Sequence, residues 1–449
     1  MNDETENDSS ALTDRSKSAL TTVFVTLFLD LVGFSIIFPL FPAMLDYYLE
    51  TEGNQGLIGV TVSFLEKFTE VAGGPSEIGI IVLFGGILAS LFSLLQFICS
   101  PIIGALSDRY GRRPLLLVSI AGIAISYGMW FFAGTFAMLV AARILGGLMS
   151  GNISTASAVV ADVTSKENRS KGMAIIGIAF GTGFILGPAI GGFSAMIDLR
   201  DYLPGLVDFG LNPFSTPALI AMFLSVINFV YVLTRFKETL PDAKEDSERV
   251  ERSINPITLF KVQEYPGVSK TNLINFLFLS IFSGMEFSLT FLAMDRLNYG
   301  PRENAYMFLF IGFILTIVQG GYVRRKSATI GPKRMSLQGL VMIVPGLVCV
   351  GLANSAGLLY LGLFLMAVGS AQVIPCLTAL ASSYAPENEQ GRILGVFRSL
   401  GALARGVGPL LACVLYWRLG STAAYIIGAF GIVVPVLIAA KLPKIPDAE

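Results

Sequence analysis

The sequence contains no histidine, and only 14% of its 449 residues are charged. Without imidazole there is no histidine ligand for zinc, no histidine-based catalytic triad and no histidine pH switch. Soluble domains average about 25% charged residues, so the low charge and the 53% of hydrophobic residues together indicate a membrane protein. Any proton that the protein handles must therefore be carried by a carboxylate.

An excess of one charge and paired cysteines are also absent. The 31 basic and 32 acidic residues nearly cancel, which argues against a nucleic-acid partner. No GxxxxGK[ST] motif and no arrangement typical of a serine or cysteine nucleophile occurs, so we expect neither an ATP-driven pump nor an enzyme, and no metal or cofactor. The four cysteines lie in apolar segments without a CxxC pair, and we interpret them as packing residues: Cys99, Cys349, Cys376 and Cys413.

Long apolar runs dominate what is present. A helix that crosses roughly 30 Å of hydrocarbon needs about 20 predominantly apolar residues. The sequence therefore predicts an all-α integral membrane protein with twelve spans, near residues 20–45, 78–104, 114–134, 136–161, 172–197, 214–235, 271–293, 304–322, 335–354, 357–382, 392–416 and 420–440.

A polar stretch of about thirty residues divides these spans six and six. We expect a cytoplasmic tail, a six-helix bundle, a cytoplasmic central loop, a second six-helix bundle and a cytoplasmic tail, at residues 1–19, 20–235, 236–270, 271–440 and 441–449. Of the 31 basic residues, 23 lie on the side of the N-terminus, 5 on the opposite side and 3 within spans. The positive-inside rule therefore predicts that both termini are cytoplasmic, in the plasma membrane or an internal membrane.

An internal repeat supports two related halves. GGYVRRKSATIGPKR (320–334) follows span eight as GALSDRYGRR (104–113) follows span two, and RGVGP (405–409) resembles part of LGPAIGG (186–192). Duplicated halves are typical of transporters whose binding site lies between the repeats.

The motifs resemble those of the major facilitator superfamily. Gly104-x-Leu-Ser-Asp-Arg-x-Gly-Arg-Arg113 is similar to its signature after span two, and Arg143-x-x-x-Gly147 to its motif in span four. Gly183-x-x-x-Gly187-Pro188-x-x-Gly191-Gly192 in span five is similar to its antiporter motif. The sequence departs from the family at Gly146, where many relatives have glutamine, and at Arg324, which replaces the aspartate of the second-half motif.

A narrower resemblance is to the tetracycline/proton antiporters and their animal relatives. It rests on Asp30-x-x-Gly-x-x-Ile-Ile-x-Pro39 in span one, on ADVT at the end of span four, and on LLQFICSP (94–101), FSGMEFSLTFL (282–292) and RSLGALARGVGP (398–409). It implies two pseudo-symmetric six-helix bundles, and a drug- or organic-anion-transporting activity coupled to protons.

Charged residues inside the spans are the candidate binding and coupling groups. A charge at mid-membrane costs from about 3 to over 10 kcal/mol and so needs a partner or a function. Asp30, near the middle of span one, is a candidate proton carrier, and we expect Arg143 of span four to be its nearest charged neighbour. A purely structural salt bridge between the two is the alternative. Glu286 and Arg405 lie at similar depths in spans seven and eleven, either as a permanent ion pair or as one that opens when substrate or a proton binds.

We assign Asp30 and Glu286 to proton coupling. The candidate substrate-binding residues are the cations and amides within the spans: Arg143, Arg398, Arg405, Gln96, Asn152, Gln319 and Gln372. The small-residue stripe of span five is expected to be a close helix interface on which the two halves rock: Gly183, Gly187, Pro188, Gly191 and Gly192.

The charged segment after span two has the character of a gate between the halves. We expect Gly104 to let spans two and eleven pack closely, and Asp108 to face the positive N-terminus of span eleven near Gly391. The resemblance implies that Arg112 reaches Asp162. The full set of predicted gating residues is Gly104, Asp108, Arg109, Gly111, Arg112, Arg113 and Asp162.

The sequence therefore predicts a monomeric secondary transporter, embedded in a lipid bilayer, that moves small amphiphilic organic solutes by alternating access with proton coupling. An uncoupled facilitator is the nearest alternative, since acids alone do not establish coupling. A non-transporting receptor or scaffold that retains the fold is the other.

Overall fold

The computed structural model describes residues 14–53, 55–72, 77–164, 169–240, 265–385 and 390–443, and no strand occurs among them. The first part of the chain forms α1 (Asp14–Ser35), the 3-10 helix η1 (Phe38–Leu40), α2 (Phe41–Glu52), α3 (Gly56–Ala72), α4 (Glu77–Tyr110), α5 (Arg112–Phe131), α6 (Phe136–Met149), α7 (Asn152–Val163), α8 (Arg169–Ser194), the 3-10 helices η2 (Leu199–Asp201) and η3 (Pro204–Phe209), and α9 (Ser215–Arg235). The second part forms α10 (Pro266–Leu297), α11 (Pro301–Ile317), the π-helix η5 (Val318–Val323), α12 (Arg324–Ile330), α13 (Pro332–Gly351), α14 (Ala356–Ser383) and α15 (Gln390–Ala440).

Eleven helical segments of the described chain are long and apolar enough to cross a membrane. The last of them, in α15, runs over both the eleventh and the twelfth predicted spans, and it is broken by Gly420, whose φ of 78° is not helical. The chain thus supplies the expected twelve spans, with the final two joined end to end through one glycine.

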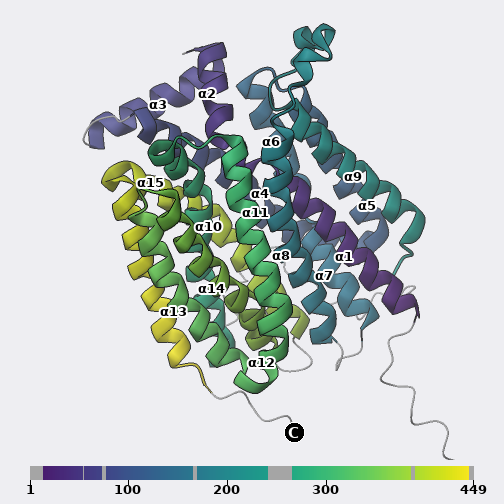
Figure 1. The fold of residues 1–449 in the computed structure, drawn as a ribbon. Helices are drawn as coiled ribbons and strands as arrows, with labels where there is room; N and C mark the ends of the chain where they lie inside the picture. The colour runs from purple at the N-terminus through teal and green to yellow at the C-terminus, as the bar shows by residue number, and fades with distance from the viewer. Residues whose placement is uncertain are drawn as a thin grey trace, which may run out of the picture.

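The helices form two bundles that stand side by side (Figure 1). We refer to α1–α9 as the first half and to α10–α15 as the second half. Within the first half α1 packs on α8 and α9, and within the second half α10 packs on α15 and α13 on α14. The halves meet mainly through α4 against α15 and α8 against α11.

The first and fourth spans are interrupted close to two polar side chains of the site, Asp30 and Asn152. In the first span α1 ends at Ser35, and Pro39 and Pro42, which lack a backbone N–H, start η1 and α2. In the fourth span α6 ends at Met149 and α7 begins at Asn152. These breaks place Asp30 just before one irregular segment and Asn152 at the start of the helix that follows the other.

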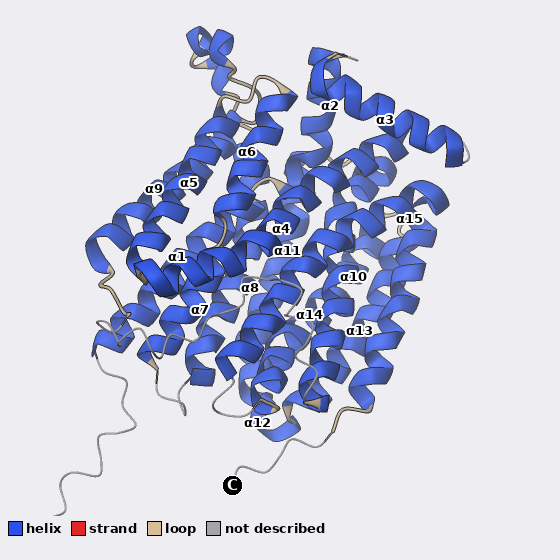
Figure 2. Cartoon of the chain, turned by 180° about the vertical axis from the view of Figure 1, so that it is seen from behind, coloured by secondary structure: helices blue, strands red, loops and turns tan. Residues whose placement is uncertain are grey.

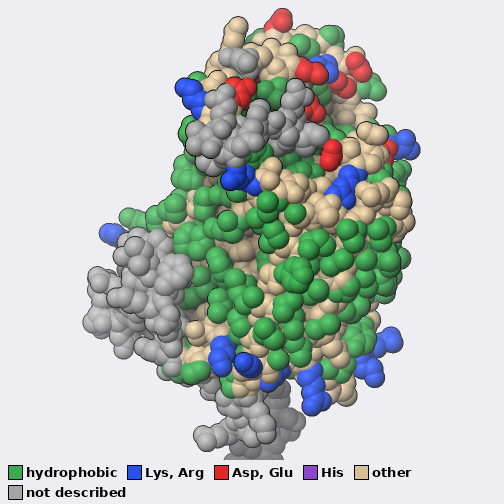
Figure 3. All heavy atoms as spheres, turned by 90° about the vertical axis from the view of Figure 1, so that its left-hand side faces the viewer, with side chains coloured by type: hydrophobic (Ala, Val, Ile, Leu, Met, Phe, Trp, Pro, Cys, Tyr) green, Lys and Arg blue, Asp and Glu red, His purple; other side chains and the backbone are tan. Residues whose placement is uncertain are grey.

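The surface has the polarity expected of a membrane protein. A broad band of hydrophobic side chains separates an end that carries Lys and Arg from an end where Asp and Glu gather with them (Figure 3). The described chain begins and finishes at the Lys- and Arg-rich end, whereas α2 and α3 lie at the opposite end (Figures 1 and 2). We call these the terminal end and the distal end.

The glycine stripe of α8 does not lie where the sequence predicted. A Cβ at Gly183 would lie 2.6 Å from Leu31, and Cβ atoms at Gly187 and Gly191 would meet Ser35 and the carbonyl of Ile36. The stripe therefore packs on the first span of the same half, and the prediction that it separates the halves is wrong for these three residues. Of the four predicted glycines, Gly192 faces the second half, because a Cβ there would lie 2.5 Å from Ala305 of α11.

Candidate functional site

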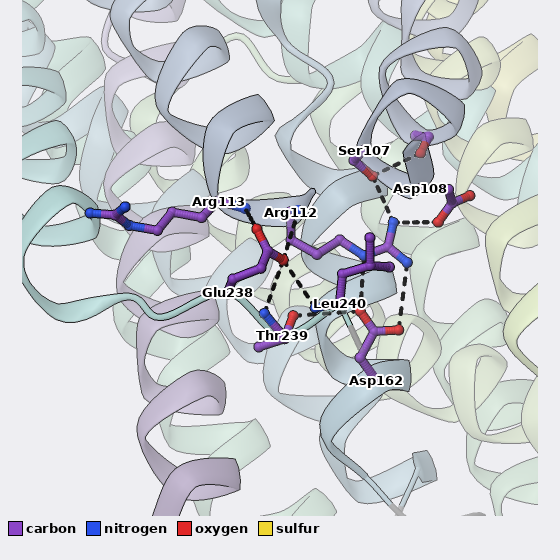
Figure 4. Close-up of polar contacts among 9 residues, drawn as sticks. Ser107, Asp108, Arg112, Arg113, Asp162, Glu238, Thr239 and Leu240 are labelled. Atoms are coloured by element: carbon purple, nitrogen blue, oxygen red, sulfur yellow. Dashed lines mark hydrogen bonds and ion pairs between the residues drawn. The ribbon is translucent and has the colours of Figure 1, made fainter. Parts of the chain in front are cut away.

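A buried arginine organises the charged segment after the second span. Arg112, the first residue of α5, is 3% exposed and lies between two acids, Asp108 of α4 and Asp162 of α7 (Figure 4). Its Nε donates to Asp162 at 2.9 Å, and its Nη1 donates to the Ser107 hydroxyl at 2.8 Å. The contact with Asp162 that the resemblance implied is therefore present.

A second carboxylate, Glu238, lies where the backbone of α5 begins (Figure 4). It accepts hydrogen bonds from the backbone N–H groups of Arg112 (2.9 Å) and Arg113 (3.0 Å), as well as from Thr239 and Leu240 (3.0 Å each). Burial favours the neutral carboxyl, but these four donors outweigh it and lower the pKa of Glu238. An anion at a helix N-terminus also complements the helix dipole.

Gly111 makes this arrangement sterically possible. Its φ is 102°, a conformation that L-residues with a side chain rarely adopt, and a Cβ would lie 2.6 Å from Glu238 Oε2. Gly111 thus supplies the turn between α4 and α5 and also admits the Glu238 carboxylate.

The described contacts of Arg112 all join elements of the first half: α4, α5, α7 and the segment after α9. Gly104 likewise faces the first half, since a Cβ there would meet the Ser154 hydroxyl of α7, so the prediction that it packs on span eleven is wrong. The predicted contact of Asp108 with the start of span eleven near Gly391 stays a prediction, because residues 386–389 just before it lie outside the described residues. Arg109 is exposed and lies over the Tyr110 ring, 5.3 Å from its centroid.

Asp30 is held by amides instead of by a cation. The Nδ2 of Asn152 (α7) donates to one carboxylate oxygen, and the Nδ2 of Asn228 (α9) donates to the other at 3.0 Å. Asn228 also donates to the carbonyl of Thr26 at 3.2 Å. The salt bridge with Arg143, which was the alternative reading, is absent among the described residues, and the carboxylate is bound by amides of α7 and α9.

Arg143 instead lies in an aromatic environment. It is 5% exposed, and its guanidinium carbon lies 4.6 Å from the ring centroid of Phe92 and 5.7 Å from that of Phe34. Its Nε and Nη2 atoms have no hydrogen-bond partner, and among the described residues no carboxylate lies within 4.0 Å of it. Tyr127 of α5 lies near both Arg143 and Asp30.

The rings around Arg143 continue towards the second half. Phe34 contacts Phe38 and Phe184, with centroid distances of 5.2 and 5.7 Å. Phe41 then contacts Phe287 of α10 at 5.3 Å, across the boundary between the halves. The result is a fixed cation within a largely apolar, aromatic wall.

In the described part of the chain, Glu286 and Arg405 of the second half do not form the direct ion pair that was one of the two predicted arrangements. The Glu286 and Arg405 side chains are close enough for their charges to interact, but among the described residues no ion pair within 4.0 Å joins them. A direct salt bridge is therefore absent from this conformation. Arg398 donates from Nη1 to the Ser157 hydroxyl of α7 at 3.3 Å, which links the two halves.

The predicted amides fall in three different places. Gln96 donates to the Ser150 carbonyl at 3.3 Å, which supports the break between α6 and α7. Gln319 lies in η5 opposite Gly181 of α8. Gln372 donates to the Val368 carbonyl of its own helix at 3.0 Å and lines a groove among η5, α13 and α14.

Asn228, Tyr127 and Glu238 were missed by the sequence reasoning. Asn228 is a polar residue within a predicted span and could have been found by the criterion that selected Asn152. Glu238 could have been suspected from its place, just beyond a span that ends on the same side as α5 begins. Nothing in the sequence distinguishes Tyr127 from the other tyrosines.

Known sequences resemble this chain over nearly its whole length. The model of the Major Facilitator Superfamily matches residues 23–409 and, in a second match, residues 310–448. "Major facilitator superfamily domain-containing protein 10" of Bos taurus is 35% identical over 435 residues, covering 91% of this chain and 90% of that protein. "Tetracycline resistance protein, class C" of Escherichia coli is 24% identical over 419 residues, covering 92% of this chain and 94% of that protein.

A solved structure shows the same arrangement of helices. The crystal structure of the human organic anion transporter MFSD10 (TETRAN) superimposes with a TM-score of 0.77 at 32% sequence identity. It covers 94% of this chain and 99% of that one, so the resemblance includes both halves.

Proposed function

This chain belongs to the major facilitator superfamily, and we propose that it is a secondary transporter that carries small amphiphilic organic anions across a membrane by alternating access, coupled to protons. Membership of the family identifies a multi-pass membrane transporter, not an enzyme. The name of the human protein in the similar structure supports an organic anion as the substrate class.

The observation that carries the proposal is the environment of Arg143. A guanidinium that is buried on two phenylalanine rings without a carboxylate partner has lost hydration that its surroundings do not replace. An anion with an aromatic or apolar body would supply the missing charge and pack on the same rings. A cationic drug would meet like charge at this point.

Proton coupling is assigned to Asp30 and Glu286. Each lies within a span, and each is without a direct cationic partner within 4.0 Å among the described residues. Two amide donors on Asp30 favour its ionised form, whereas the membrane opposes it, and this balance is what a group that gains and loses a proton requires. Glu286 would act on Arg405, whose charge it faces without contact.

Alternating access would follow from rearrangement between the two halves. We assign the gating role to the segment around Asp108 and Arg112, which its described contacts anchor in the first half, together with the link from Arg398 to Ser157, which joins the halves; the gate is expected to be closed when the cavity faces outward. The basic residues at the terminal end support a cytoplasmic orientation for both chain termini, and we propose that the monomer is the working unit (Figure 3).

Uptake into proteoliposomes tests the anion assignment. The probes are a radiolabelled aromatic carboxylate and an uncharged amide of the same skeleton. A charge-assisted hydrogen bond contributes about 1.5–3 kcal/mol, so Arg143→Gln should lower kcat/KM for the carboxylate by about 10- to 150-fold. Arg302→Gln, which removes an exposed arginine at the distal end, is the matched control and should have no such effect. Equal carboxylate uptake by wild type and Arg143→Gln would refute the assignment.

The same vesicles test coupling. An imposed pH gradient should drive accumulation by wild type but not by Asp30→Asn or Glu286→Gln, while exchange at equal pH persists. Wild-type uptake that ignores the gradient would identify an uncoupled facilitator instead. Folded protein that moves no solute in either assay would favour the receptor or scaffold alternative.

A further inference from the structure

A groove opens on the second half, apart from Asp30, Arg112 and Arg143 of the first half, and Gln372 is part of its lining. It has a volume of about 610 Å³ and is lined mainly by apolar side chains of η5, α13 and α14, among them Val318, Val341 and Val368. Val341 is 51% exposed and Tyr322 is 40% exposed, so the groove is open at its rim. α13 packs on α12, α14 and α15, all in the second half, which places the groove on the perimeter of the molecule.

The walls of the groove belong to candidate membrane spans. These three segments are long and apolar enough to span a bilayer: Pro301–Ser327, Pro332–Gly351 and Ala356–Ser383. Lipid chains are therefore the apolar groups available to fill it.

A cluster of cations lies at the terminal end of the same helices. Between Glu303 and Glu387 the sequence contains no acidic residue. The five cations in that interval lie in α12 and in the first turn of α13: Arg324, Arg325, Lys326, Lys333 and Arg334. Lys333 donates to the carbonyl of Leu442, and the other four are exposed.

The corresponding segment of the first half is built differently. There Asp108 and Asp162 neutralise Arg112, and Glu238 accepts from the start of α5. In the second half Arg324 stands where the first half has an acid, and no carboxylate of residues 304–386 is available to replace it. Among the described residues no ion pair within 4.0 Å neutralises these cations, and the phosphates of the adjoining membrane surface can supply the negative charge.

We propose that this groove binds one anionic phospholipid of the adjoining leaflet, with an acyl chain in the groove and the phosphate on the basic cluster. The spacing along α13 fits such a molecule. Gln338 lies four residues beyond Arg334, about 6 Å along the helix, and Val341 lies about 10 Å beyond it. The headgroup, the glycerol ester region and the start of the chain would follow one another in that order. Tyr322 and Gln338, at the rim, supply polar groups at the depth of the esters.

Native mass spectrometry of the full chain in mixed micelles tests the proposal. The probes are dioleoyl phosphatidylglycerol and dioleoyl phosphatidylcholine, which have identical chains and differ in net headgroup charge. Each basic residue near a lipid surface contributes about 1 kcal/mol, or about fivefold in affinity. Wild type should therefore bind one phosphatidylglycerol at least about fivefold more tightly than phosphatidylcholine. Arg324→Gln/Arg325→Gln should remove that preference and leave phosphatidylcholine binding unchanged.

Val341→Trp, which fills the groove, should weaken retention of both lipids about fivefold or more. Val434→Trp is the matched control, because Val434 of α15 is 48% exposed and does not line the groove. Identical lipid retention in these two variants would overturn the location of the site. Equal wild-type affinity for the two lipids would overturn the role of the basic cluster. Size-exclusion profiles that match wild type establish that each variant is folded, and the assay does not depend on transport.

Discussion

Replacing Glu238 tests whether a carboxylate at the start of α5 stabilises the first half. The carboxylate accepts four backbone hydrogen bonds at 2.9–3.0 Å, two of them from the first turn of α5. Hydrogen bonds to a charged group contribute about 1.5–3 kcal/mol each when they are buried. A simple sum overestimates the effect here, because Glu238 is only half-buried and water reaches the freed N–H groups.

Two known energies give a lower estimate of the loss of stability in Glu238→Ala. Loss of a helix N-cap costs about 0.5–2 kcal/mol, and the charge–dipole interaction at a surface site contributes about 0.3–1 kcal/mol. With solvent screening we expect Glu238→Ala to lower the free energy of unfolding by about 1–3 kcal/mol. Glu238→Gln should cost about half as much, because one amide oxygen can still accept part of the hydrogen bonds.

The pH dependence gives the sharper test. The pKa of Glu238 is lowered in the folded protein, so the unfolded chain binds a proton first as the pH falls. The stabilisation is therefore fully present above the ordinary glutamate pKa of about 4.3 and is lost as the pH falls through the lower folded pKa. The difference in stability between wild type and Glu238→Gln should shrink over that acidic range.

The assay is equilibrium unfolding in mixed micelles, titrated with sodium dodecyl sulfate at several pH values between 7 and 3.5. Glu50→Gln, at an exposed glutamate of the distal end, is the control for a change of one charge. A difference between wild type and Glu238→Gln that stays constant with pH would refute the electrostatic part of the argument. Wild-type stability in Glu238→Ala would refute the capping role itself.

Four further predictions follow from the same unfolding assay. Gly191→Ala places a methyl group against the Ile36 carbonyl and should destabilise by about 1–3 kcal/mol or more, whereas Gly177→Ala, on the same helix with nothing within 4 Å, should be near neutral. Gly104→Ala should cost about 1–3 kcal/mol, and adding Ser154→Gly should recover most of it, since the clash is with the Ser154 hydroxyl. Asp162→Asn should cost up to about 3 kcal/mol, at or below the usual range for breaking a buried pair, because Asp108 remains beside Arg112. Arg143→Leu should be neutral or stabilise by about 1–4 kcal/mol while it abolishes anion uptake, and a large loss of stability would show that the charge has a structural partner.

Hydropathy was sufficient to predict the spans, because a helix in lipid needs an apolar length set by the bilayer. It could not predict that the first and fourth spans are broken. Apolar prolines such as Pro39 and Pro42, and the pair Ser150–Gly151, leave the mean hydropathy high while they interrupt the backbone ladder. The break between the last two spans, in contrast, was expected from hydropathy, and it falls at Gly420.

The contacts of the charged side chains within the spans were harder to predict than their positions along the spans. Counting residues from a span end placed Asp30 near the middle of span one, and hydropathy put Arg143 in span four, but neither gives the direction in which a side chain points. Asp30 points towards Asn152 and Asn228, and Arg143 towards Phe34 and Phe92. The contact of Arg112 with Asp162 was expected only from the resemblance, because charge pattern alone offers several acids. The prediction of which helix the glycine stripe of α8 packs against was wrong for a similar reason. Small residues permit a close approach of two helices but do not determine which helix approaches.

The three arginines within the spans differ in a way that bears on mechanism. Arg398 donates to Ser157 across the halves, and Arg405 has the Glu286 charge opposite it. Arg143 is compensated mainly by two aromatic rings. A desolvated cation–π contact returns about 2 kcal/mol, so the two together fall short of most of the range of about 3 to over 10 kcal/mol that a charge at mid-membrane costs. The deficit is largest at Arg143, so an anion that binds there gains the most. Because Tyr127 lies near both Arg143 and Asp30, an anion on Arg143 also raises the cost of a charged Asp30. Substrate binding and protonation would then favour each other, which gives the proposed coupling a direct electrostatic route.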